Sequence, residues 1–336
     1  MREHMMRFCR SAVLAVALLI CAGGAGAQPA YVPTPLDRQI TPAWFEERWG
    51  DLEQLAASLR TPEQRTAGGE WLLKEFYRAF EQSHLGVDAV AEFPDGFAWG
   101  RLDRWSAAFP ESPTPRLLRV IALVSLSRLS ADARVYQQPL DSGWQPQIAY
   151  AEMAREELLA NPAIGQQDPH YFVLLLRMLS AFRASPDDII LGHADAAARW
   201  PLYDELHAEA LLRLAHPARF DGARLDAFAN TVHAATRSAA GEQVYARMMI
   251  RAFESGFGHD LMSRLPVRWS RLRDGLRQIA DRFPAEENRQ RMALFACLAG
   301  DLPSAQAAFR ETSPVAVRHV WLNPATHKAC RTWSMP

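Results

Sequence analysis

The chain has 336 residues, of which 49% are hydrophobic and 22% are charged, and its 37 Lys and Arg residues nearly balance its 38 Asp and Glu residues. This composition is typical of a folded globular protein and excludes a disordered or collagen-like chain. A formal net charge of −1 excludes nucleic acid or an anionic lipid surface as the main partner, because such partners attract strongly basic proteins. The basic residues are 35 Arg and only two Lys, Lys74 and Lys328, a bias to which we assign no function.

The N-terminal segment, residues 1–27, has the pattern of a secretory signal peptide. Three Arg and one Glu lie within the first ten residues, an apolar run covers residues 12–22, and Ala25-Gly26-Ala27 is an A-x-A cleavage site. The run is too short to cross a bilayer, so we expect cleavage after Ala27, no stable membrane insertion, and a periplasmic or secreted location. Cleavage leaves 34 basic and 37 acidic residues, a net charge of −3. A lipidated Cys21 is the alternative, although Ile20 stands where a small residue is expected.

Helical spacing dominates the rest of the chain. Residues 28–40 contain three prolines and predict an extended lead-in, and residues 41–336 predict a single all-helical domain. Apolar residues recur three and four positions apart, as in the run of Leu72, Leu73, Phe76 and Phe80. No stretch alternates β-branched and polar residues, and no hairpin turn is flanked by strands. The predicted fold class is all-α.

Prolines mark the expected helix boundaries. A capping residue followed by Pro predicts a helix start, because Pro lacks only an N–H that has no partner in the first turn. Seven pairs have this form: Thr41-Pro42, Thr61-Pro62, Ser112-Pro113, Asp168-Pro169, Ser185-Pro186, Ser313-Pro314 and Asn323-Pro324. Pro also disfavours helical geometry in the residue before it, so four others predict helix ends: Phe109-Pro110, Asn161-Pro162, Trp200-Pro201 and Phe283-Pro284.

The spacing of these ends suggests stacked helical hairpins of about 40 residues, the size of an α-solenoid repeat. The clearest unit has a helix that ends at Phe283-Pro284, a second helix over residues 292–298, a Gly300-Asp301 turn and a third helix over residues 304–309. This unit resembles a tetratricopeptide (TPR) hairpin. We therefore expect a TPR-like stack with degenerate repeats.

Several segments also resemble an exported bacterial helical family of unknown function that is often found near tetratricopeptide repeats. The resemblance is carried by Tyr245-Ala246-Arg247, Trp269, Phe283-Pro284, Asn288, Phe295 to Asp301 and Trp321. It implies a helical fold, and it supplies no catalytic residue.

Two cysteines, Cys297 and Cys330, remain after cleavage of the leader. In an oxidising compartment they form a disulfide that closes a 33-residue interval, and the alternative is two separate buried thiols. Their spacing does not match a C-x-x-C redox or zinc site.

Motifs for common chemistries are absent from the sequence: we find no phosphate-binding glycine loop, G-x-S-x-G or H-E-x-x-H. His193 and Asp195, near Asp187 and Asp188, suggest a metal site, but positions two apart on a helix point about 200° apart. We interpret the aspartates as first-turn helix acids and expect no metal and no cofactor. His207, His216, His319 and His327 are interpreted as surface or core residues.

One acidic residue stands out as a weak catalytic candidate. Glu70 lies between Gly68-Gly69 and Trp71, and a glycosidase needs two acids across a cleft, one of them in an apolar pocket. The alternative is an acid in the first turn of a helix.

All ten Trp residues lie after the leader, and most occupy helical apolar positions that predict core packing. Trp99 and Trp144, each beside a glycine, are the candidate aromatics of an exposed groove.

Our leading functional hypothesis is a non-enzymatic envelope protein that binds a protein or peptide. The alternatives are an all-α glycan-active enzyme, lysozyme-like or toroidal, and a structural subunit of an envelope assembly.

Overall fold

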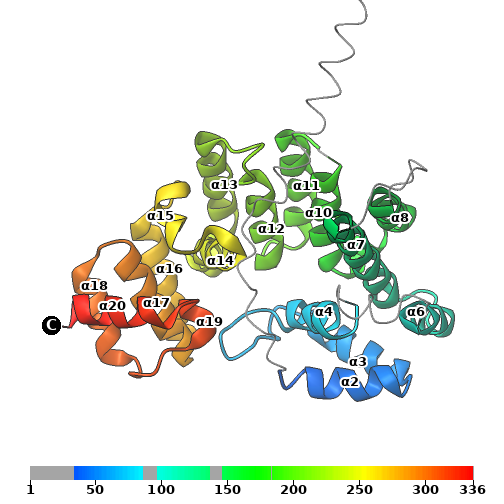
Figure 1. The fold of residues 1–336 in the computed structure, drawn as a ribbon, viewed down its shortest axis with the longest axis horizontal. Coiled ribbons are helices and arrows are strands. Elements are labelled where there is room, and N and C mark those ends of the chain that lie inside the picture. Colours follow the sequence, from blue (N-terminus) through cyan, green and yellow to red (C-terminus); the bar gives the residue numbers. More distant parts are fainter. Residues whose placement is uncertain (1–33, 86–96, 137–145, 183, 336) are drawn as a thin grey trace, which may run out of the picture. The chain divides into compact units, whose positions relative to one another are not determined.

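The computed structural model describes residues 34–85, 97–136, 146–182 and 184–335, and within these ranges all regular secondary structure is helical (Figure 1). One isolated bridge joins Arg65 and Trp71. The predicted all-α class is therefore confirmed. The elements in chain order are α2 (Asp37–Phe45), α3 (Trp49–Leu59), α4 (Leu72–Ser83), α6 (Phe97–Ala108), α7 (Pro113–Tyr136), α8 (Pro146–Ala160), α9 (Ile164–Gln167), α10 (His170–Ala181), α11 (Pro186–Arg199), α12 (Asp204–Leu214), α13 (Gly222–Ala240), α14 (Gln243–Ala252), η1 (Phe253–Phe257), η2 (Gly258–Asp260), α15 (Leu261–Arg264), α16 (Trp269–Arg282), α17 (Glu286–Leu298), α18 (Leu302–Glu311), α19 (Arg318–Trp321) and α20 (Pro324–Ser334).

The predicted leader, residues 1–27 with its cleavage site after Ala27, lies outside the described residues, as do residues 28–33 of the lead-in. In the part of the chain that is described, no helix combines the length and the apolar character needed to span a membrane.

The four predicted helix ends are confirmed. Each helix stops one residue before the X-Pro pair, as α8 stops at Ala160 before Asn161-Pro162 and α16 stops at Arg282 before Phe283-Pro284. Four predicted starts are confirmed as well, those of α7, α10, α11 and α20. The start of α11 is a complete capping box, in which the Ser185 hydroxyl and the Asp188 carboxylate each accept a bond from the other residue's backbone N–H.

Three predicted starts are wrong. Pro42 lies inside α2, which begins at Asp37, so the predicted lead-in to residue 40 is too long. The cause is local: the Asp37 carboxylate accepts bonds from both the N–H and the hydroxyl of Thr34. Thr61-Pro62 and Ser313-Pro314 lie in loops. At the first, the Gln64 N–H donates to the Thr61 carbonyl at 3.2 Å in a local turn. At the second, the Ser313 N–H donates to the Glu286 carboxylate at 2.7 Å.

Helix packing follows the chain order over the second half of the molecule. α10 packs against α12, α12 against α14 and α14 against α16, and α11 and α13 lie against their neighbours in this series. α17 packs against both α16 and α18, and Gly300 takes a positive φ of 68° in the turn between α17 and α18. Asp301 caps α18 and accepts a bond from the Trp269 indole at 2.9 Å. The unit of three helices predicted from the sequence is therefore present.

Aromatic side chains fill the core. Trp44, Trp71, Trp105 and Trp321 are 2% exposed or less, which confirms core packing for these four. Trp44, Trp49 and Trp105 contact one another, with the rings of Trp49 and Trp105 stacked at 5.3 Å between centroids. Trp333 is the exception among the residues described, since 44% of it is exposed.

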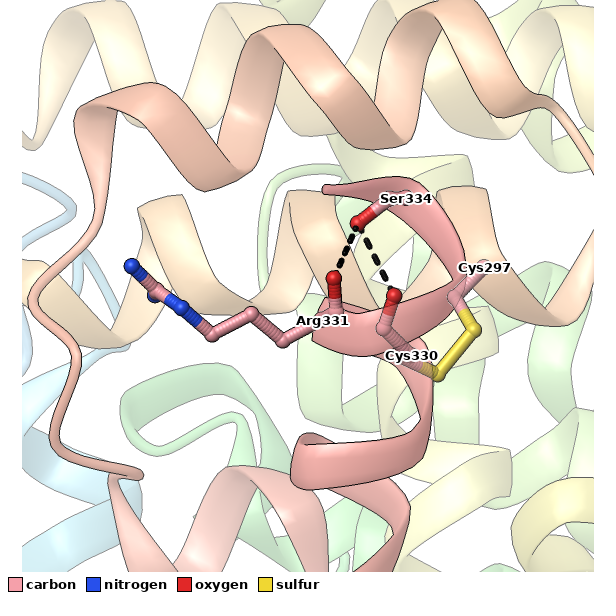
Figure 2. Close-up of a disulfide and its surroundings, with 4 residues drawn as sticks. All are labelled: Cys297, Cys330, Arg331 and Ser334. Atoms are coloured by element: carbon pink, nitrogen blue, oxygen red, sulfur yellow. Dashed lines mark hydrogen bonds between the residues drawn. A yellow bond between two sulfur atoms is a disulfide. The ribbon is translucent and has the colours of Figure 1, made fainter. Parts of the chain in front are cut away.

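The predicted disulfide is confirmed. Cys297 on α17 and Cys330 on α20 are bonded, with Cα atoms 5.8 Å apart, and Cys330 is buried. Figure 2 shows the bond beside the last turn of α20, where the Ser334 hydroxyl donates to the Cys330 carbonyl at 2.8 Å. The disulfide therefore fixes the last helix of the described chain against α17.

Candidate functional site

Charged side chains from segments far apart in the sequence meet between α4, α12, α14, η1 and α17. We call this set the interior charge cluster. Its members are Glu70, Lys74, Asp204, Glu205, Arg247, Arg251, Glu254 and Arg291. Buried charges are costly unless each is paired, so the arrangement of partners determines what this region can do.

Lys74, one of the two lysines in the chain, lies at the centre of the cluster with 13% of its side chain exposed. Its ammonium is 3.4 Å from Glu205 and 3.8 Å from Glu70. Burial alone would lower the pKa of Lys74, but the two carboxylates outweigh burial and raise that pKa above its usual range. Lys74 therefore acts as a fixed positive charge.

Glu70 is held ionised. The pKa of the Glu70 carboxyl lies well below its usual range despite burial. The Lys74 ammonium is the main cause, and the Arg291 guanidinium lowers this pKa further. Arg291 lies 3.7 Å from Glu70 and 3.0 Å from Glu254. Glu70 precedes α4 by two residues, so it is not the first-turn acid of the alternative interpretation.

The remaining carboxylates of the cluster are paired in the same way. Arg251 lies 3.3 Å from Glu205, and burial, which would raise the pKa of Glu205, is outweighed by Arg251 and Lys74, so that pKa is lowered. Arg247 lies 3.6 Å from Asp204. Each charge therefore has an opposite charge beside it.

A glycine pair brings the loop before α4 against the C-terminal helices. The Gly68 carbonyl accepts bonds at 3.2 Å from Arg247 on α14 and from Asn288 on α17. Gly69 has a φ of +82°, and a Cβ there would lie 2.3 Å from the Phe283 ring. Only glycine permits this approach, which places Glu70 within reach of Arg291.

The space left between these side chains is small. The cavity that they line has a volume of about 10 Å³, room for about one water molecule. No sugar residue fits within such a cavity. The paired charges therefore join segments of the chain rather than receive a polymer in this conformation.

Glu75 on α4 differs from the other acids, since it is 7% exposed and its Oε1 atom has no hydrogen-bond partner. Burial, together with the neighbouring Glu70 carboxylate, raises the pKa of Glu75 to about 7. Glu70 and Glu75 thus form an acid pair in which one member is ionised and the other is half protonated near neutral pH.

The candidate groove aromatics are not brought together. Trp99 is half-buried against the core, with the Arg119 guanidinium 5.4 Å from its ring centroid. Trp144 lies outside the described residues. Of these two residues the structure therefore describes only Trp99, which lies at the edge of the core.

The suggested metal residues point to different places. His193 is buried, with its Nε2 atom 2.8 Å from Nδ1 of His207, and Asp195 is exposed. Burial, helped by His207, lowers the pKa of His193 to about 3. In the portion of the chain described, no group of three or more His, Cys, Asp or Glu side chains is arranged to hold a metal ion.

Sequence reasoning identified Glu70 but missed its partners. Arg291 comes from the distant helix α17, and no spacing along the chain links it to Glu70. The available signals are local: Glu70 and Lys74, like Glu287 and Arg291, are four residues apart, a spacing that favours ion pairs on a helix.

No protein-family model, curated protein or solved structure matches this chain.

Proposed function

We propose that this protein is an exported, non-enzymatic helical-repeat protein that binds a protein or peptide partner in the bacterial envelope. The observation that carries the proposal is the succession of packed helices from α10 to α18, since stacked helical hairpins expose long faces to partners. We read α16, α17 and α18 as a TPR-like unit within this stack. The disulfide supports an oxidising compartment, where such bonds persist.

The interior charge cluster supports a structural role for the residues that most resemble a catalytic set. A general acid needs a raised pKa and access to substrate, whereas Glu70 has a lowered pKa and lies in a cavity with room for about one water molecule. Asn288 and Arg247, which carry part of the family resemblance, bind the Gly68 carbonyl. These bonds favour a structural role for both residues.

The test has two steps. Mass spectrometry of the protein from the envelope fraction is expected to find an N-terminus at Gln28. Cross-linking in intact cells, followed by reconstitution with the purified partner, is expected to give a saturable complex. A protein that stays in the cytoplasm with its leader intact contradicts export, and a reconstituted mixture without a complex contradicts binding.

A glycan-active enzyme is the second candidate, and the acid pair of Glu70 and Glu75 is the observation that favours it. A raised pKa beside an ionised carboxylate is the arrangement of a glycosidase. Sugar release from cell-wall polymer that is lost in both Glu70→Gln and Glu75→Gln, with folding retained, supports the enzyme and contradicts the binding proposal.

A further inference from the structure

The last helix carries a second cavity, which we call the α20 pocket. It has a volume of about 440 Å³, within the range of small-ligand sites, and is lined by Pro314, His327, Lys328, Arg331, Thr332 and Met335. Four of these residues, His327, Lys328, Arg331 and Thr332, recur at spacings of three and four and share one face of α20, and Met335 follows the last residue of the helix. Pro314 adds a wall from the loop between α18 and α19.

Basic groups in the pocket have no acidic partner among the described residues. No carboxylate there pairs with Lys328 or Arg331, whereas Lys74, Arg177 and Arg291 each have one. The Arg331 side chain extends away from the disulfide (Figure 2), and its Nη1 atom is buried without a hydrogen-bond partner. Its guanidinium carbon lies 5.8 Å from the Phe309 ring centroid. Among the described residues, no carboxylate therefore compensates the charge of this arginine.

A buried histidine supplies a third polar group. His327 is 6% exposed, and its Nε2 atom has no hydrogen-bond partner. The ring is fixed between Trp321 and Phe309, with centroid distances of 4.8 and 5.9 Å. Burial, with the Arg331 charge beside it, lowers the pKa of His327, so the ring is neutral and carries one N–H at neutral pH. A buried ring nitrogen without a hydrogen-bond partner is costly, and a ligand that pairs with it removes that cost.

The helix that carries these groups is held rigidly. Asn323 caps its first turn, the disulfide at Cys330 fixes its centre, and Ser334 bonds back to the carbonyls of Cys330 and Arg331. The basic groups are therefore held in position before any ligand arrives, which lowers the entropic cost of binding.

We propose that the α20 pocket binds a carboxylate of an acidic peptide segment, with an apolar side chain of that segment against Met335 and Pro314. Arg331 matches a carboxylate with two parallel N–H donors, and Lys328 adds a second positive charge. His327 donates to the remaining carboxylate lone pair. The inference rests on the proposed function, since it assigns a ligand class to a peptide-binding protein.

The experiment uses the full chain and two dye-labelled eight-residue peptides in a fluorescence anisotropy titration. One peptide alternates Glu and Leu, and the other carries Gln in place of each Glu. We expect the Glu/Leu peptide to bind at least tenfold more tightly. Arg331→Gln and Lys328→Gln are each expected to weaken that binding at least tenfold, which corresponds to about 1.4 kcal/mol.

Arg237→Gln is the matched control, because Arg237 is an exposed arginine of α13 with no ion pair among the described residues. We expect no change in this variant. Circular dichroism and a thiol assay verify that each variant is folded with its disulfide intact.

Three results overturn the inference. The first is equal affinity for the two peptides, and the second is binding that the Arg331 and Lys328 variants leave unchanged. The third is displacement of the peptide by millimolar inorganic phosphate, or equal binding to vesicles of anionic phospholipid, because each indicates a general anion site. If the Gln peptide binds and the Arg331 and Lys328 variants leave its affinity unchanged, the protein binds peptides but the α20 pocket is not the binding site. A chain that forms no complex with any peptide or protein contradicts the proposed function itself.

Discussion

The two lysines of this chain lie in opposite electrostatic surroundings. Lys74 is largely buried between Glu70 and Glu205, in a cluster where each charge has an opposite charge beside it and the free space holds about one water molecule. Lys328 is exposed beside Arg331 on α20, where no carboxylate of the described residues lies close and the cavity measures about 440 Å³. The comparison shows that paired charges join segments of the fold, whereas uncompensated charges beside open space are available to a ligand.

The strongest test of this comparison is the same substitution at both lysines. Lys74→Met leaves two buried carboxylates short of a partner, and we expect it to reduce the free energy of unfolding by about 3–5 kcal/mol. Lys328→Met is expected to change it by less than about 0.5 kcal/mol. Urea denaturation measures both. Equal effects in the two variants contradict the division between the regions.

The disulfide gives a second test, because it holds α20 and not the interior charge cluster. Reduction releases a loop between residues separated by 33 positions, and we expect a loss of about 3–4 kcal/mol in the free energy of unfolding. Hydrogen exchange is expected to accelerate in α20 and to stay slow in α4, α12 and α14. The Cys297→Ser, Cys330→Ser double variant controls for the reductant. Exchange that accelerates equally in both regions indicates that they unfold as one unit.

Glu75 tests the electrostatics of the interior charge cluster through pH. Its pKa is raised from 4.5 in the unfolded chain to about 7, so the folded state binds the proton more tightly and loses stability as the pH rises from 4.5 to 7. Glu75→Gln removes this loss. We expect the variant to be more stable than the wild type by about 3 kcal/mol at pH 8 and equal to it at pH 4. A variant that is less stable at pH 8 shows instead that the cluster requires an ionised Glu75.

The smallest effect expected is at the glycine pair that carries the loop to the interior charge cluster. Gly69→Ala puts a Cβ within 2.3 Å of the Phe283 ring at a φ of +82°, and we expect a loss of about 2 kcal/mol in the free energy of unfolding. Gly50→Ala is the control, because nothing lies within 4 Å of a Cβ there and the residue is helical. We expect it to stabilise the protein by up to about 1 kcal/mol. Thermal unfolding distinguishes the two, and equal midpoints contradict the close approach.

Part of the candidate site was accessible from the sequence. Glu70 stood out because of the glycines before it, and those glycines do make a close approach. The chemistry expected of it was different, since a general acid requires a raised pKa and the structure surrounds Glu70 with cations. The raised pKa belongs to Glu75, which has no distinguishing neighbours in the sequence.

Local rules failed at three of the predicted helix starts, and the causes differ. At two of them another local contact takes precedence: the Thr34 and Asp37 pair begins α2 before Pro42, and a turn in which the Gln64 N–H donates to the Thr61 carbonyl forms at Thr61-Pro62. At Ser313-Pro314 the competing bond is tertiary, because capping chemistry acts over three or four residues and the Ser313 N–H donates to Glu286, 27 positions away.

The sequence by itself determined the helical class, the four helix ends marked by proline and the identity of the two cysteines that form the disulfide. These features depend on backbone geometry and on composition, which act locally or over the whole chain. Only the tertiary structure decided which charges are paired. Coulomb attraction between buried groups depends on separations of 3 to 4 Å, and the folded packing of α4, α12, α14 and α17 sets those separations. The same packing leaves Lys328 and Arg331 without an acidic partner among the described residues.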